Sequence, residues 1–262
     1  MLCREMSVAG SFYPDSVDEL KRYFSHFDKI YDDNFVKNKN NPRAVIVPHA
    51  GYIYSGFTAS VAYNILKNSE IKTFVIVGPS HKIAFDGISI CESNVYDTPL
   101  GTIESDTELV TLIKENFKLN FIKEAHVEHS TETQFPFVKY YLPKAKIVEL
   151  VYSNANPKDI SKVIDLILEQ KNVGVIISTD LSHFYNLKDA KKLDNICLNA
   201  LNNYDLNMLH KGCEACGIRG VEAMMISAKK YDFKYRLLDY RTSADFSKDE
   251  SRVVGYMSAY FH

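Results

Sequence analysis

The segment that decides the fold spans residues 43 to 51 and reads Arg43-Ala-Val-Ile-Val-Pro-His49-Ala-Gly51. A short apolar run between polar or turn residues is typical of a buried strand, and the proline and glycine after it indicate a sharp exit turn. The same arrangement recurs at residues 73 to 81, which end in Gly-Pro-Ser-His81, and at residues 173 to 183, which end in Thr-Asp-Leu-Ser-His183. Three predicted strands are therefore each followed closely by a histidine.

The rest of the chain alternates between strand and helix patterns. Further strands are predicted at residues 86–91, 146–151 and 252–260, and amphipathic helices at 16–26, 56–67, 107–117 (with Ser105 or Asp106 as N-cap), 134–142, 157–169 and 221–230. Such alternation predicts an α/β fold of three layers, in which a mixed, mainly parallel central sheet lies between helices. The polar stretch from Asp32 to Pro42 is too short to separate two domains, so we expect it to be a loop within a single domain of residues 1–262.

The amino-acid composition limits which binding partners and which cell compartment we expect. The 31 basic and 33 acidic residues leave a net charge of -2, which gives none of the positive field that nucleic-acid binding needs. No stretch approaches the roughly 20 apolar residues of a membrane span, and the first residues lack a signal-peptide pattern. The five cysteines are scattered and odd in number, unlike a secreted disulfide framework. We therefore expect a cytoplasmic protein in a reducing compartment, with neither nucleic acid nor membrane as partner.

The three histidines at the strand exits predict a site. If the strands are parallel neighbours, their carboxyl ends share one edge of the sheet, so His49, His81 and His183 converge there. A neutral imidazole binds a borderline metal ion or exchanges a proton near physiological pH. The alternative for each histidine is an ordinary turn, in which the ring caps a helix or bonds a carbonyl.

Two further residues are candidates for the same site. His129 precedes a predicted helix start, where the helix dipole favours a neutral ring, although a purely structural role is equally compatible with the pattern. Cys216 precedes the apolar helix predicted at residues 221–230, with Gly217 and Gly220 between them, and backbone N–H groups there favour a thiolate; the alternative is a small buried hydrophobe. Its CxxC spacing with Cys213 lacks the second pair of a zinc site and the context of a thioredoxin motif. Three other histidines are predicted to lie at the surface: His26, His210 and His262.

Several short motifs occur in one order along nearly the whole chain. Together they resemble the Memo family: Ala9-Gly-Ser-Phe-Tyr-Pro14, Pro48-His49-Ala-Gly-Tyr-Ile-Tyr-Ser-Gly56, Gly78-Pro-Ser-His81, Glu128-His129-Ser130, Ser178-Thr-Asp180-Leu-Ser-His183, Cys216-Gly217 and Ser251-Arg-Val-Val-Gly-Tyr256. The resemblance implies a fold similar to the LigB-like class III extradiol dioxygenases, in which two histidines and a carboxylate hold iron.

The resemblance also implies a ligand set and roles for the neighbouring residues. In Memo proteins the ligands are two histidines and a cysteine, which match His49, His81 and Cys216. His183 and His129 match the additional histidines that line the pocket, and Asp180 lies beside His183 in the same motif. A thiolate is softer than a carboxylate, so the set favours Fe(II) or Cu, with Zn as a further option, and dioxygenase activity does not transfer automatically.

Three functions are compatible with these residues. The first is a metal-dependent, dioxygenase-like redox enzyme acting on a small substrate, with His183, His129 and Asp180 as catalytic residues. The second is a non-catalytic protein that binds a peptide or small ligand in a relic of the dioxygenase pocket. The third is a Cys–His hydrolase that uses Cys216. Animal relatives are associated with phosphotyrosine peptides, and microbial relatives often accompany a radical-SAM protein, which the resemblance implies as a pathway partner.

Overall fold

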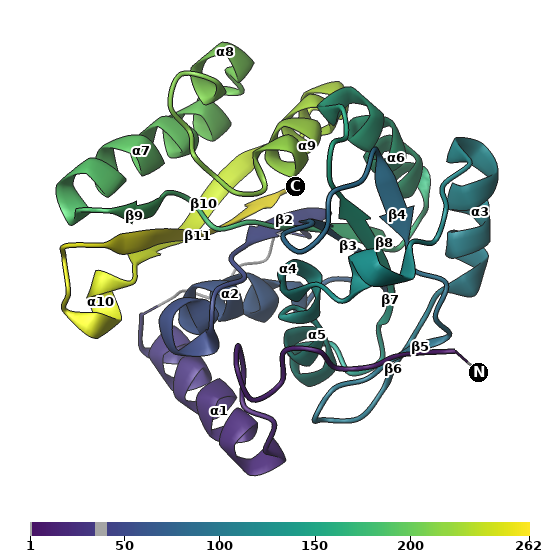
Figure 1. Cartoon of the computed structure of the whole chain (residues 1–262), viewed down its shortest axis with the longest axis horizontal. Coiled ribbons are helices and arrows are strands. Elements are labelled where there is room, and N and C mark those ends of the chain that lie inside the picture. Colours follow the sequence, from purple (N-terminus) through teal and green to yellow (C-terminus); the bar gives the residue numbers. More distant parts are fainter. Residues whose placement is uncertain (1, 35–40) are drawn as a thin grey trace.

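A mixed β-sheet forms the centre of the computed structural model, which describes residues 2–34 and 41–262 (Figure 1). Its middle is parallel and consists of β2 (Ala44–Val47), β8 (Val173–Ser178), β3 (Thr73–Pro79) and β7 (Lys146–Tyr152), in this spatial order. Antiparallel strands flank the middle: β11 (Val253–Phe261) and β10 (Tyr235–Thr242) beyond β2, with β9 (His183–Tyr185) beside β11, and β4 (Ile88–Ile90) beyond β7. Every residue of β2, β3 and β8 is buried, as expected of parallel strands that are covered on both faces.

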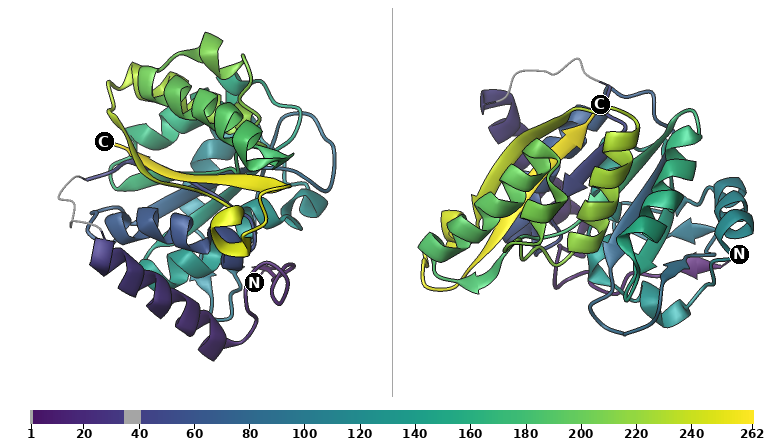
Figure 2. Two further views of the ribbon diagram at one scale, coloured as in Figure 1. Left: turned by 90° about the vertical axis from the view of Figure 1, so that its left-hand side faces the viewer. Right: turned by 90° about the horizontal axis from the view of Figure 1, so that it is seen from above.

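Helices cover both faces of this sheet, and Figure 2 shows the sheet between two helical layers. One layer contains α1 (Val17–Asn34), α2 (Tyr52–Leu66) and α5 (Phe135–Tyr141), with the short α4 (His129–Glu132) leading into it. The other contains α3 (Thr107–Phe117), α6 (Pro157–Glu169), α7 (Leu187–Asn203), α8 (Leu206–Leu209) and α9 (Ile218–Lys230). The predicted three-layer α/β fold is therefore confirmed.

The remaining elements lie at the periphery. A small second sheet joins β1 (Cys3–Arg4), β5 (Val95–Tyr96) and β6 (Ile103–Glu104), and the 3₁₀ helix η1 (Lys123–His126) precedes α4. The one-turn helix α10 (Ala244–Ser247) connects β10 to β11. No helix in the described ranges is both long and apolar enough to cross a bilayer.

Helix boundaries follow local chemistry. Asp106, one of the two predicted N-caps, accepts a hydrogen bond from the backbone N–H of Leu109 and starts α3. Asn156 caps α6 in the same manner, and Pro157 occupies the first helical position, where its missing N–H costs nothing. Both helices have the bounds that the sequence predicts.

Other boundaries differ from the prediction. The first helix continues to Asn34, so the first residues of the polar stretch are helical; residues 35–40 lie outside the described part of the chain. The second helix begins earlier, at Tyr52, directly after the predicted turn. The segment at residues 134–142 is preceded by a separate one-turn helix, α4, because Pro136 requires a new helix start. His26 and His210 are exposed as predicted, whereas the prediction for His262 is wrong because it is half-buried beside Tyr260.

The structure also contains a disulfide that the sequence does not predict, and such a bond is unusual in the reducing compartment expected from the cysteine pattern. Cys197 in α7 is bonded to Cys213, 16 residues later in the chain. Both residues are buried, so the bond ties α7 to the loop that carries Cys216. Cys213 is consequently not a partner for Cys216, and the CxxC spacing has no redox or zinc meaning here.

Candidate metal centre

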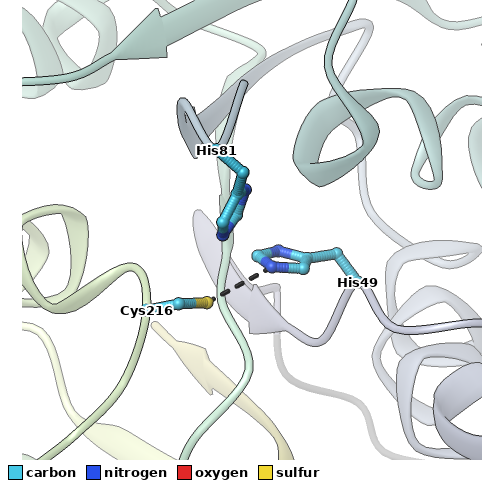
Figure 3. A group of neighbouring side chains, drawn as sticks. All are labelled: His49, His81 and Cys216. Atoms are coloured by element: carbon cyan, nitrogen blue, oxygen red, sulfur yellow. Dashed lines mark hydrogen bonds between the residues drawn. The ribbon is translucent and has the colours of Figure 1, made fainter. Parts of the chain in front are cut away.

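The predicted ligands meet at the carboxyl edge of the parallel strands. His49 follows β2 and His81 follows β3, while Cys216 lies just before α9, and all three side chains point toward one another (Figure 3). Each offers one ligand atom, and the three atoms lie within 4.8 Å of one another. The Sγ atom of Cys216 is 3.3 Å from Nε2 of His49, and the centroids of the two imidazole rings are 5.2 Å apart. Residues separated by up to 167 positions in sequence thus share one site because β2 and β3 both pair with β8.

Hydrogen bonds to the Nδ1 atoms orient both histidines. Nδ1 of His49 lies 3.0 Å from the hydroxyl of Ser178, and Nδ1 of His81 lies 3.1 Å from a carboxylate oxygen of Glu128. The Nε2 atoms are therefore the ones left for a ligand, an arrangement typical of metal-binding histidines. Burial, together with the neighbouring His81 and His129, lowers the pKa of His49 well below its usual value, so its ring is neutral and keeps a lone pair for a cation.

Glu128 is a site residue that the sequence reasoning did not single out. Its carboxylate is fully buried and accepts hydrogen bonds from the backbone N–H of His81 at 2.6 Å and of Ser130 at 3.1 Å, in addition to those from the rings of His81 and His129. Burial favours the protonated acid, but the hydrogen bonds from His129 and His81 outweigh it and hold the pKa of Glu128 far below its usual range. The signal was its place directly before His129 and Ser130, where a carboxylate suits an N-cap.

His129 is brought into the site as predicted. It is the first residue of α4, and its Nδ1 atom lies 2.8 Å from Glu128. Its ring centroid is 4.5 Å from that of His81 and 5.3 Å from that of His49. On its other side the ring stacks on Phe12 at 4.5 Å, so the N-terminal segment forms a wall beside this histidine.

The N-terminal segment is held there by one buried carboxylate, that of Glu132 in α4. Glu132 accepts hydrogen bonds from the backbone N–H groups of Ser7 and Val8, from the hydroxyls of Ser7 and Tyr13, and forms an ion pair with Arg4. Since Glu132 and His129 share one helical turn, the wall and the imidazole are fixed to the same element.

Asp180 adjoins the predicted ligands and His183 lies farther out. Oδ1 of Asp180 accepts from the backbone N–H groups of His49 and Ala50, and Oδ2 lies 4.0 Å from Nε2 of His49. Burial raises the pKa of Asp180, so this acid holds its proton more tightly than a surface aspartate. In the described part of the chain no hydrogen bond or ring contact joins His183 to the predicted ligands; its half-buried ring contacts Phe184 and is close enough to lower the pKa of Asp180 electrostatically. His183 therefore belongs to the rim of the site.

The expectation that the surroundings of Cys216 favour a thiolate is wrong. Burial and the nearby Asp180 raise the pKa of this thiol to about 12, although the backbone N–H of Asp180 lies 3.3 Å from the sulfur. The first N–H of the α9 turn, that of Gly217, instead donates to the hydroxyl of Thr179. The position must be glycine, since a Cβ there would meet Thr179 at 2.7 Å. The sulfur becomes a thiolate when a cation takes the place of its proton.

The whole chain matches a known family. A family model described as "Memo-like protein" covers residues 4–260. The chain belongs to the Memo family. Curated relatives of similar length include MEMO1 family proteins of Sulfurisphaera tokodaii (34% identical, covering 99% of both chains), Methanobrevibacter smithii (34%, 99% of this chain and 100% of the relative) and Aquifex aeolicus (32%, 100% of both). These Memo family names carry no reaction, so chemistry has to be argued from the site.

The donor set in this Memo family member fits a transition-metal ion. Two imidazole nitrogens and one sulfur suit Fe(II), Cu or Zn(II), and three protein ligands leave coordination positions for a small molecule. The Nδ1 contacts with Ser178 and Glu128 supply the outer shell that such sites require. A structural zinc site would have four protein ligands, whereas the group found here has three.

Proposed function

We propose that this chain is a metal-dependent redox enzyme, dioxygenase-like in its site, that acts on a small organic molecule. In this proposal His49, His81 and Cys216 hold Fe(II) or Cu, and Zn(II) is the alternative ion. The observation that carries the proposal is the shared orientation of the donors: both Nδ1 atoms are hydrogen-bonded elsewhere, and the remaining donor atoms converge. A bound redox metal supplies Lewis acidity and one-electron chemistry that side chains lack.

The surrounding side chains then bind the substrate and move protons. His129 is 17% exposed and lies between Glu128 and Phe12, so its Nε2 atom is the group best placed to exchange a proton with a bound molecule. Phe12 offers a flat apolar surface against which a planar ligand packs. Asp180 keeps His49 in place through its backbone, and burial raises the pKa of its carboxyl above the usual aspartate value. His183 at the rim meets the substrate on entry.

Metal analysis tests the ligand set. Protein purified without chelator should contain stoichiometric metal, and His49→Ala and Cys216→Ser should each lose most of it while keeping the fold by circular dichroism. Cys3→Ser is the matched control, because Cys3 is an exposed free cysteine outside the site. Oxygen consumption by the iron- or copper-loaded protein with a panel of planar phenolic compounds then tests the reaction. Metal that survives the loss of both ligands rejects the assignment.

One observation favours a second candidate function, that of a non-catalytic protein for a peptide or small ligand. The pocket places the imidazole of His129 against the ring of Phe12, next to the carboxylate of Glu128, and these side chains could bind a planar or charged ligand without a metal ion. Ligand binding that is equal in chelated and metal-loaded protein would favour this candidate over the enzyme. We further propose that the protein is cytoplasmic, that residues 1–262 form one domain, and that a radical-SAM protein acts in the same pathway.

A further inference from the structure

A second group of metal-ligand side chains lies outside the candidate metal centre, and its ligands come from three elements. Cys91 follows β4, His126 ends η1, and Glu149 lies in the middle of β7. All three are buried, and one ligand atom from each lies within 4.8 Å of the other two. We propose that Cys91, His126 and Glu149 form a buried zinc site, which is independent of the function proposed above.

Unsatisfied atoms point to an ion between these side chains. Nδ1 of His126 lies 2.8 Å from Oε2 of Glu149, yet neither atom makes an aligned hydrogen bond with any described residue. Buried polar atoms of this kind usually have a partner, because leaving one unpaired costs roughly 1–3 kcal/mol. The two atoms form an ion pair without hydrogen-bond geometry, and a cation held between them would give each atom a directional partner.

The other atoms of the same side chains are already occupied. Nε2 of His126 is hydrogen-bonded to the hydroxyl of Ser89 at 2.9 Å, and Oε1 of Glu149 accepts a hydrogen bond from the hydroxyl of Thr131 at 2.5 Å. Each of the two residues therefore keeps one atom for an ion, and its orientation is fixed from behind, as in metal sites with an ordered outer shell. An imidazole nitrogen, a carboxylate oxygen and a thiolate are the donors that Zn(II) takes, with a water as the fourth ligand.

Charge balance permits the exchange of a proton for zinc. The group includes Arg4, which lies 2.9 Å from Glu132 and 3.7 Å from Glu149, so two buried carboxylates face one guanidinium. These three side chains leave one negative charge uncompensated while Cys91 remains a thiol. Burial and Glu149 raise the pKa of that thiol to about 12, so the metal-free form keeps its proton.

Zinc binding neutralises the group. The ion brings two positive charges and displaces the proton of the Cys91 thiol, so the thiolate and the uncompensated carboxylate balance it. No oxidant or reductant takes part. A buried divalent ion next to Arg4 is therefore compensated, whereas an ion added without proton release would not be.

The position explains what the ion would do. Glu149 accepts a hydrogen bond from Thr131 in α4, the turn that also carries His129. Cys91 precedes α3 in the chain, and His126 follows it. Zinc would join the edge of the sheet to the elements that support the catalytic pocket. Its removal is expected to lower thermal stability and to leave the ligands of the candidate metal centre in place.

Cobalt spectroscopy tests the proposal in a Cys216→Ser background, which removes the thiol of the candidate metal centre. Protein is unfolded, freed of metal by chelation and refolded with Co(II) or Zn(II), because the site is buried. We expect a near-ultraviolet thiolate-to-cobalt band, release of the Cys91 thiol proton as zinc binds, and a higher melting temperature than without metal. Adding Cys91→Ser should abolish the band, and adding Cys3→Ser should leave it unchanged.

Either of two results would overturn the zinc proposal. Absence of the band and of proton release in folded Cys216→Ser protein would overturn the site and leave a buried ion-pair cluster. Persistence of the band after Cys91→Ser would also overturn it. If Cys91→Ser does not refold, Glu149→Gln gives the same decision through proton release, since loss of the carboxylate must weaken zinc uptake for the proposal to stand.

Discussion

Replacing Glu128 with glutamine is the most informative single perturbation of the candidate metal centre. The substitution keeps the size of the side chain but removes its charge and replaces one oxygen by a hydrogen-bond donor. In the native protein the two oxygens accept from the ring of His81, the ring of His129 and the backbone N–H groups of His81 and Ser130. An amide has one acceptor oxygen for these four donors. Both rings contact Oε1, and Oε2 accepts from the backbone N–H of His81, so the NH₂ group faces either the rings or this N–H. The first orientation forces an imidazole to move its proton to Nε2, and the second places two donors against each other.

The magnitude follows from the loss of the carboxylate. In either orientation the imidazoles lose a negatively charged partner that raises their affinity for a cation, and a proton moved to Nε2 of His81 would also occupy the atom that the metal requires. Loss of an outer-shell partner of this kind typically weakens metal binding 10- to 100-fold, which corresponds to about 1.4–2.7 kcal/mol. We expect Glu128→Gln to fall within this range.

The assay is a competition titration of Fe(II) or Zn(II) against a chromophoric chelator, with Glu124→Gln as control. Glu124 is exposed and lies only four residues away. A metal affinity of Glu128→Gln within twofold of wild type, in a protein that melts normally, would refute the argument that this carboxylate sets the ring orientation.

The stability of the same variant should depend on pH. Because the pKa of Glu128 is lowered in the folded protein, its contribution is fully present above the ordinary glutamate value of 4.5 and is lost as the pH falls below it. The difference in unfolding free energy between wild type and Glu128→Gln should therefore be largest at neutral pH and shrink in acid. A gap that is constant from pH 7 to pH 3 would contradict this reading.

Three further outcomes are expected. Asp180→Asn should leave the melting temperature at pH 7 unchanged or higher, because burial raises the pKa of this acid and a buried charge costs stability. The same variant should slow any metal-dependent turnover. A large loss of stability would contradict the argument. Reducing the bond between Cys197 and Cys213 should lower the unfolding free energy in urea by about 3 kcal/mol, the loop entropy for this separation, and added reductant should have no effect on the double alanine variant. Gly255→Ala should destabilise the protein by roughly 1–3 kcal/mol, because the new methyl group would meet a carboxylate oxygen of Asp194 at 2.1 Å; a normal urea midpoint would show that this carboxylate moves freely.

Much of the fold could be predicted from hydrophobic pattern alone. Strands such as 173–178 are continuous apolar runs because both faces are buried, and the cap and proline at Asn156 and Pro157 fix the start of α6. Helix α7 and strand β10 were not predicted, and one physical reason accounts for both. Both carry charged residues between their apolar positions and lie at the edge of the sheet, where one face meets solvent and the pattern is weak.

The candidate site was predictable where a histidine follows a buried strand. His49 and His81 converge because parallel neighbours end at the same edge, which the sequence implies. The role of Glu128 was not predictable, since its importance rests on contact with His81, 47 residues away. The state of Cys216 was mispredicted, because the cost of burying a thiolate depends on Asp180, which only the folded chain places nearby.

The attachment of the first residues to Glu132 has a practical consequence for protein production. A recombinant form that starts after Tyr13 would strip away the donors that satisfy this carboxylate and uncover one side of His129. Trimming of this kind, often done to help crystals grow, would here yield a weakened protein with an altered pocket. Assays on such a form would underestimate what the intact chain can bind.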